Sequence, residues 1–182
     1  MEFPDIPRGL TPIEVCHDLY NKAALVPKNR AIVEIGVFKG RTLQWIAEGA
    51  RSGKGAKVYG VDPWDEGPPT GGKHNYHDPN VEKEARERAE ASKATIIKGD
   101  SAVVGAEWAG PRIGLLYIDG NHKYPGVLAD WENWHSHLVR GATVVWDDYT
   151  RSGVQRVVDD LYERGTFKSF DILDGRTVVA NV

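Results

Sequence analysis

The segment AIVEIGVFKGRT, residues 31–42, joins a run of apolar side chains to two glycines, Gly36 and Gly40. Such a run is typical of a strand buried on both faces, and the glycines allow the chain to turn sharply into a helix. A strand, a turn and a helix in this order indicate the first unit of a parallel sheet with crossover helices. The spacing Gly-x-x-x-Gly differs from the G-x-G-x-x-G of a typical dinucleotide site.

Extended and helical patterns alternate along the rest of the chain. The first helix is expected to start with Thr11 as its cap, Pro12 in its first turn and Glu14 reaching back to the cap amide. Two consecutive strands around Asp174-Gly175 indicate a closing hairpin. The expected helices are 11–26, 41–52, 81–93, 125–138 and 154–164, with 81–93 charged and solvated on its outer face; the expected strands are 31–36, 57–62, 94–100, 113–120, 142–148, 167–173 and 176–182.

This pattern predicts an α/β fold in a single domain, residues 1–182. We expect a doubly wound, Rossmann-like, mostly parallel seven-stranded sheet with an antiparallel C-terminal hairpin and helices on both faces. Residues 63–80 are rich in Pro, Gly, His and Asn, and are expected to form a mobile loop over the active site. His74 and His77 lie in that loop, either idle or closing over a substrate.

The bulk composition favours an ordinary soluble protein. The chain has 182 residues, of which 41% are hydrophobic and 27% charged, and its formal net charge is −3. The absence of a basic stripe argues against a nucleic-acid partner, and the absence of a run of ~18 apolar residues argues against a membrane span. A single cysteine, Cys16, and no visible secretory signal suit a cytoplasmic protein.

Polar residues end three successive strands, where open α/β sheets bind ligands. Glu34, just before the turn formed by Gly36 and Gly40, suits a cationic group such as an amine or a sulfonium. Asp62 lies where a ribose-binding acid is expected, and Asp100-Ser101 offers a polar edge for an adenine amino group. Trp64 is a candidate for stacking on the cofactor or the substrate. The expected cofactor contacts are Glu34, Gly36, Phe38, Gly40, Thr42, Asp62, Trp64, Asp100 and Ser101.

Acidic residues end the next two strands, at Asp119 and at Asp147-Asp148. Neighbouring parallel strands lie ~4.8 Å apart, so carboxylates at their ends can meet, and a hard divalent cation would relieve their repulsion. Such residues also commonly cap helices or lie on the surface. His122, three residues after Asp119, could take a proton from a hydroxyl near that cation, or simply bond a loop carbonyl.

In this order, the segments VEIGVFKGRT, VYGVDPWD, IIKGDS, LLYIDGNHKYPGVLADWENW and GATVVWDDY resemble the class I methyltransferases of the macrocin and mycinamicin sugar O-methyltransferase type. The resemblance runs from about residue 30 to 160. The Asp-Gly-x-His-x-Tyr segment and the later Asp-Asp pair are its specific part, whereas the glycine loop is shared with methyltransferases at large.

The resemblance implies transfer of a methyl group from S-adenosylmethionine to a sugar hydroxyl. It also implies Mg²⁺, or another divalent cation, held by Asp119, Asp147 and Asp148, with His122 as the base. The chain is shorter than those relatives, so we expect a smaller or more exposed acceptor, a glycoside or oligosaccharide with neighbouring hydroxyls. A homo-oligomer is compatible with the resemblance.

Three other functions fit parts of the pattern. A catechol also presents paired oxygens to a metal, so a catechol-type O-methyltransferase is one alternative. A nicotinamide-dependent oxidoreductase uses a similar sheet, although the missing G-x-G-x-x-G disfavours it. A catalytically silent nucleotide-binding module is the third.

Overall fold

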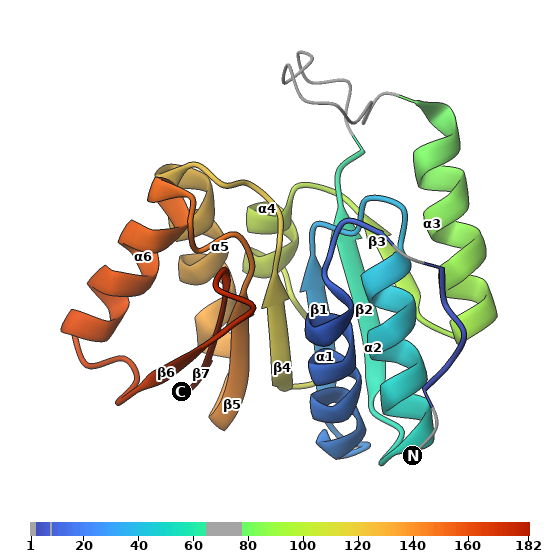
Figure 1. The fold of residues 1–182 in the computed structure, drawn as a ribbon, viewed down its shortest axis with the longest axis horizontal. Coiled ribbons are helices and arrows are strands. Elements are labelled where there is room, and N and C mark those ends of the chain that lie inside the picture. The colour runs from blue at the N-terminus through green and yellow to red at the C-terminus, as the bar shows by residue number, and fades with distance from the viewer. Residues whose placement is uncertain (1–2, 8, 65–77) are drawn as a thin grey trace.

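The chain folds around a seven-stranded sheet of order β3-β2-β1-β4-β5-β7-β6, shown by a computed structural model that describes residues 3–7, 9–64 and 78–182 (Figure 1). The strands are β1 (Ala31–Ile35), β2 (Lys57–Asp62), β3 (Thr95–Lys98), β4 (Ile113–Ile118), β5 (Leu138–Trp146), β6 (Phe170–Leu173) and β7 (Thr177–Asn181). The helices are α1 (Ile13–Leu25), α2 (Arg41–Ser52), α3 (Pro79–Ser92), α4 (Ser101–Ala106), α5 (Tyr124–Trp134), the 3₁₀ helix η1 (His135–His137) and α6 (Ser152–Glu163).

The strand order confirms the predicted doubly wound sheet. β1 pairs in parallel with β2 on one side and with β4 on the other, so the order of the strands reverses between β1 and β4. β7 runs antiparallel to both β5 and β6, which confirms the C-terminal hairpin. In such sheets the ligand binds beyond the carboxyl ends of the strands at the reversal point. That point lies between the ends of β1 and β4.

Each face of the sheet is covered by its own set of helices. On one face, α1, α2 and α3 bury apolar side chains such as Ile32 and Leu115. On the other, α5 and α6 bury neighbours such as Val33 and Leu116. Successive strand residues point to opposite faces, which is why adjacent residues enter different cores. In Figure 1, α1 and α2 lie in front of β1 and β2.

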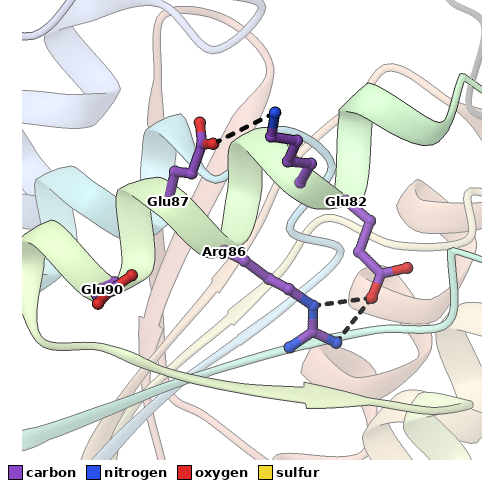
Figure 2. Close-up of a pocket in the computed structure, with 5 residues that line it drawn as sticks. Glu82, Arg86, Glu87 and Glu90 are labelled. Atoms are coloured by element: carbon purple, nitrogen blue, oxygen red, sulfur yellow. Dashed lines mark hydrogen bonds and ion pairs between the residues drawn. The ribbon is translucent and has the colours of Figure 1, made fainter.

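The outward face of α3 carries the charged side chains that the sequence predicted to be solvated. Arg86 Nη2 lies 2.7 Å from Glu82 Oε1, and Lys83 Nζ lies 3.9 Å from Glu87 Oε1. Together with Glu90 these side chains line a shallow hollow (Figure 2). Exposed pairs of this kind contribute little stability, about 0.2–1 kcal/mol each. The hollow is therefore a solvated helix surface.

The predicted cap of the first helix is wrong. Pro12 is the N-cap residue of α1, and no side chain caps it. The Thr11 hydroxyl instead lies 3.0 Å from the Thr42 hydroxyl, on α2. The Thr11 hydroxyl thus pairs with a side chain of another helix and not, as the sequence suggested, with the backbone of α1.

Several predicted boundaries also shift. The predicted helix 125–138 ends as α5 at Trp134 and continues only as η1, because Leu138 already belongs to β5 and pairs with Ile113. The short helix α4 was not predicted, since six residues are too few to show a helical period. The predicted loop 63–80, with His74 and His77, falls largely on residues 65–77, outside the described parts of the chain. No helix among the described residues is long and apolar enough to cross a membrane.

The ends of β1 and β4 meet at Gly36. This residue has a φ of +87°, which favours glycine. A methyl group added there would collide with the carbonyl oxygen of Asp119 and would lie 2.8 Å from the Gly120 Cα atom. The absence of a side chain at Gly36 therefore lets the two strand ends come together.

We expect Gly36→Ala to be far more destabilising than Gly55→Ala. Gly55 also has a positive φ, +75°, but a methyl group added there has no neighbour within 4 Å. Gly55→Ala should cost only the backbone strain, about 1 kcal/mol. Gly36→Ala adds the collision with β4 and should cost about 2–5 kcal/mol in total. Urea unfolding of both variants measures the difference; equal losses would contradict the close approach of β1 and β4 at Gly36.

Candidate active site

The glycine turn, residues 36–40, is fixed by a carboxylate from the neighbouring strand. Asp62, at the end of β2, is nearly buried, and its Oδ2 accepts hydrogen bonds from the backbone N–H groups of Val37 at 2.8 Å and Phe38 at 2.9 Å. Its Oδ1 accepts from the Trp64 N–H at 2.9 Å. Asp62, which was predicted to bind a ribose, therefore shapes the turn that would receive a ligand.

Trp64 closes this turn from the side of β2. Its indole Nε1–H donates to the Phe38 carbonyl oxygen at 2.9 Å, and Arg86 lies 6.0 Å from the ring centre. Both Trp64 and Phe38 have a positive φ, +40° and +51°, so the backbone on both sides of this contact is strained. The indole ring is thus held against the glycine turn, where stacking on a cofactor was predicted.

Glu34 is a carboxylate buried inside the sheet. It is 1% exposed, and its Oε2 has no hydrogen-bond partner among the described residues. Burial raises the pKa of Glu34 well above its ordinary value, and the charges of Asp119 and Asp62 raise it further. An unsatisfied buried acid is costly, so a donor group from a ligand would stabilise it.

Four other predicted cofactor residues have protein partners. Gly40 is the N-cap residue of α2, with a φ of +75°, and Thr42 is bonded to Thr11. Asp100 caps α4, since its Oδ1 accepts from the N–H groups of the next turn at 2.9 and 3.3 Å. The Ser101 hydroxyl donates to Asp130 Oδ1, on α5. Of these four residues, only Ser101 is bonded to an acid from another helix. The sequence also predicted an adenine amino group at Ser101.

The structure brings His122 between two carboxylates of the acidic cluster, which comprises Asp119, Asp147 and Asp148. His122 Nε2 lies 3.7 Å from Asp119 Oδ1 and 3.3 Å from Asp148 Oδ2. The interaction with Asp119 raises the pKa of His122. Burial, together with the charges of the other two acids, raises the pKa of Asp119 to about 6. The ends of β4 and β5 therefore deliver their acids to one point, beside a base.

Asp147 is the most buried acid of the cluster, and it is held by Arg176 and Thr177 on the C-terminal hairpin. Arg176 Nη2 lies 2.9 Å from Asp147 Oδ2, and the Thr177 hydroxyl donates to Asp147 Oδ1 at 2.9 Å. Arg176 also lies 3.6 Å from Asp148 Oδ1. The hairpin thus supplies a guanidinium to the cluster, a contact that was not predicted from the sequence.

The buried side chain of Tyr117 links the ends of β4 and β5. Its hydroxyl lies 3.3 Å from Asp119 Oδ2 and 3.2 Å from Asp147 Oδ2, and the side chain is fully buried. Tyr117 was missed because its place inside an apolar strand resembles core. Arg176 was missed because the antiparallel pairing of Trp146 with Val178, which brings the start of β7 level with Asp147, is visible only in the folded protein.

The carboxylate oxygens of the acidic cluster are the type of ligand that a hard divalent cation prefers. Asp119 and Asp148 converge on His122 Nε2, so two of the three carboxylates already lie close together. Asp147, in contrast, is engaged by Arg176. Within residues 3–7, 9–64 and 78–182, no three His, Cys, Asp or Glu side chains are arranged as a ready metal site. A cation that uses all three acids would therefore have to loosen the Arg176 contact.

Comparisons with known proteins place this geometry in context. A family model described as a methyltransferase domain matches residues 33–149. An uncharacterized protein, R132, of Acanthamoeba polyphaga mimivirus is 28% identical over 140 residues, which cover 73% of this chain and 58% of that protein. This chain therefore matches less than two thirds of the length of that curated relative.

Solved structures with the same fold include O-methyltransferases. The calicheamicin methyltransferase CalS11 superposes with a TM-score of 0.70 and 19% identity, covering 92% of this chain and 77% of that one. CalS11 is also described as a TDP-rhamnose 3'-O-methyltransferase. An O-methyltransferase from Bacillus cereus, in complex with S-adenosylhomocysteine (SAH), gives a TM-score of 0.67 at 15% identity, covering 98% of this chain and 84% of that one. At these identities the likeness establishes a shared fold.

We expect Arg176→Gln to destabilise the protein by about 2 kcal/mol, because it removes the cation from the buried Asp147 carboxylate while leaving its other hydrogen bonds. Arg151→Gln is the matched control, since its exposed guanidinium lies 3.8 Å from Asp148 Oδ2 and should contribute less than about 0.5 kcal/mol. Urea unfolding without added metal measures both. Equal stability of the two variants would show that Arg176 does not hold the cluster.

Proposed function

The chain belongs to the methyltransferase domain family, and from this premise we propose that it transfers the methyl group of S-adenosylmethionine to a sugar hydroxyl. We further propose that Mg²⁺, or another divalent cation, acts at the acidic cluster. The acceptor would be a glycoside, an antibiotic sugar or an oligosaccharide with neighbouring hydroxyls.

One observation carries this proposal: the glycine turn and the acidic cluster lie side by side. Gly36 packs against the backbone of Asp119 and Gly120, so the turn after β1 and the acids after β4 share one edge of the sheet. A cofactor in the glycine turn would thus be next to an acceptor at the cluster. Methyl transfer needs this proximity, because the donor carbon and the attacking oxygen must be aligned.

The proposed cofactor contacts draw on the buried acids around the turn. Glu34 has an unsatisfied oxygen below the glycine turn, which suits the amino group of S-adenosylmethionine. Gly36, Phe38 and Gly40 form the turn itself, while Asp62 holds it and Trp64 covers its side. The B. cereus structure with SAH, a product of the proposed reaction, supports this cofactor class.

In the proposed reaction S-adenosylmethionine would supply the methyl group, so that the acceptor hydroxyl would become a methyl ether and SAH would be left. His122 Nε2 would take the proton of that hydroxyl. His122 is placed for this role because its Nε2 faces the space between Asp119 and Asp148 and has no hydrogen-bond partner among the described residues. The nearby carboxylates then stabilise the protonated imidazole.

Asp119 and Asp148 would hold the divalent cation, with Asp147 as the third carboxylate. When bound, such a cation supplies positive charge that lowers the pKa of a neighbouring hydroxyl and orients two adjacent acceptor oxygens. Asp147 contributes already without it, because Arg176 and Thr177 fix the end of β5 through this residue. The sugar acceptor is supported by the fold shared with CalS11, whose description names TDP-rhamnose.

We expect methyl transfer from labelled S-adenosylmethionine to require a divalent cation, and Asp148→Asn to abolish that transfer while leaving SAH affinity within about threefold. An acceptor screen across sugars and catechols, with Mg²⁺ or with EDTA, measures turnover; calorimetry measures SAH binding. Asp171→Asn, an exposed acid on β6, is the control and should behave as the wild type. Full turnover in EDTA would rule out the cation, and turnover confined to catechols would rule out the sugar.

Replacing His122 with Ala should lower kcat by about 100-fold or more, with KM for the acceptor changed by only a few-fold. This split follows if His122 takes the proton during transfer and does not anchor the acceptor. Steady-state kinetics with the best acceptor of the screen measures both constants. An unchanged kcat would remove His122 as the base.

A further inference from the structure

A buried carboxylate on α5 lies outside the residues singled out by the sequence. Asp130 is 3% exposed and is surrounded on its helix by the buried side chains of Val127, Trp131 and Trp134. Charged groups are rarely buried among apolar ones unless they are paired or used. We therefore expect the Asp130 carboxylate to have hydrogen-bond partners.

Only one of its two oxygens has such a partner. Oδ1 accepts a hydrogen bond from the Ser101 hydroxyl, whereas Oδ2 has none among the described residues. Ser101 is itself fixed, because its carbonyl oxygen accepts from the Trp134 Nε1–H at 2.9 Å. The free oxygen is therefore held in place by a rigid contact between α4 and α5.

The free oxygen of Asp130 faces the region where β1 and β4 end. A methyl group added at Gly120 would lie 3.7 Å from Asp130 Oδ2. Gly120 in turn packs against Gly36, in the glycine turn. Asp130 thus lies on the same edge of the sheet as the proposed cofactor, between Ser101 and the backbone that follows β4.

Asp100, the acid expected to read adenine, is otherwise engaged. Its Oδ1 caps α4, and its residue is exposed. Asp130, in contrast, is the buried acid next to Ser101, and burial raises its pKa to about 6, with the Asp100 charge adding to the shift. A ligand group that donates a hydrogen bond would relieve the burial cost of Asp130.

We propose that Asp130 Oδ2 accepts a hydrogen bond from the exocyclic amino group of the adenine ring, so that Asp130 selects adenine among purines. This inference rests on the proposed use of S-adenosylmethionine. A purine with an oxygen in place of the amino group would place that oxygen, a hydrogen-bond acceptor, against Asp130 Oδ2, which is also an acceptor. Such a purine would bind more weakly by about 10- to 100-fold.

The test compares SAH with S-inosylhomocysteine, which differs by that single replacement. Calorimetry measures the ratio of the two affinities for the wild type, Asp130→Leu and Asp130→Asn. We expect the wild type to prefer SAH by about 10- to 100-fold and Asp130→Leu to lose most of that preference. Asp130→Asn should retain part of it, since its amide oxygen can still accept. Glu132→Gln, an exposed change on the same helix, is the control and should keep the wild-type ratio.

A merely structural Asp130 would change both affinities together and leave the ratio intact, which would overturn the inference. A wild type that binds both ligands equally would overturn it as well. A wild type that binds neither ligand would contradict the proposed cofactor itself, and this inference with it. Asp130→Leu removes a buried charge, and its circular dichroism spectrum and urea midpoint verify that the ratio is measured on folded protein.

Discussion

The approach of Gly36 to the backbone of Asp119 and Gly120 is the contact on which the rest of the site depends. The doubly wound sheet places β1 beside β4, but only a residue without a side chain allows their ends to meet. The consequence is geometric. A turn suited to a cofactor and a cluster suited to an acceptor become neighbours on one edge of the sheet, although they lie more than 80 residues apart in sequence.

That edge concentrates negative charge, and the protein balances it with its own groups. Asp62 is satisfied by three backbone N–H groups, and Asp147 by Arg176 and Thr177. Backbone donors and a guanidinium are suited to this task because their positions are set by the fold and do not depend on a ligand. The C-terminal hairpin therefore does more than complete the sheet, since it carries the cation that holds the end of β5.

The sequence was sufficient to predict the sheet and the residues at its edge, because buried parallel strands are continuous apolar runs, and the runs of β2, β4 and β5 are each bounded by an aspartate. It was insufficient wherever a side chain had two partners to choose from. Thr11 was expected to cap α1, but its hydroxyl pairs with Thr42. Arg176 and Asp130 gave no local pattern, since their partners come from other strands and helices. Such contacts exist only once the tertiary structure has formed.

Among the described residues, two buried acids have an oxygen without a hydrogen-bond partner, and both border the proposed cofactor; a third such oxygen belongs to the partly exposed Asp18 on α1. Glu34 and Asp130 each keep one oxygen without a partner, and burial raises the pKa of both. A sequence selected for stability alone would replace such groups with apolar ones, since an unpaired buried acid lowers stability. Glu34 and Asp130 both lie on the edge where ligands bind in doubly wound sheets, and donor groups from a ligand at that edge would satisfy them.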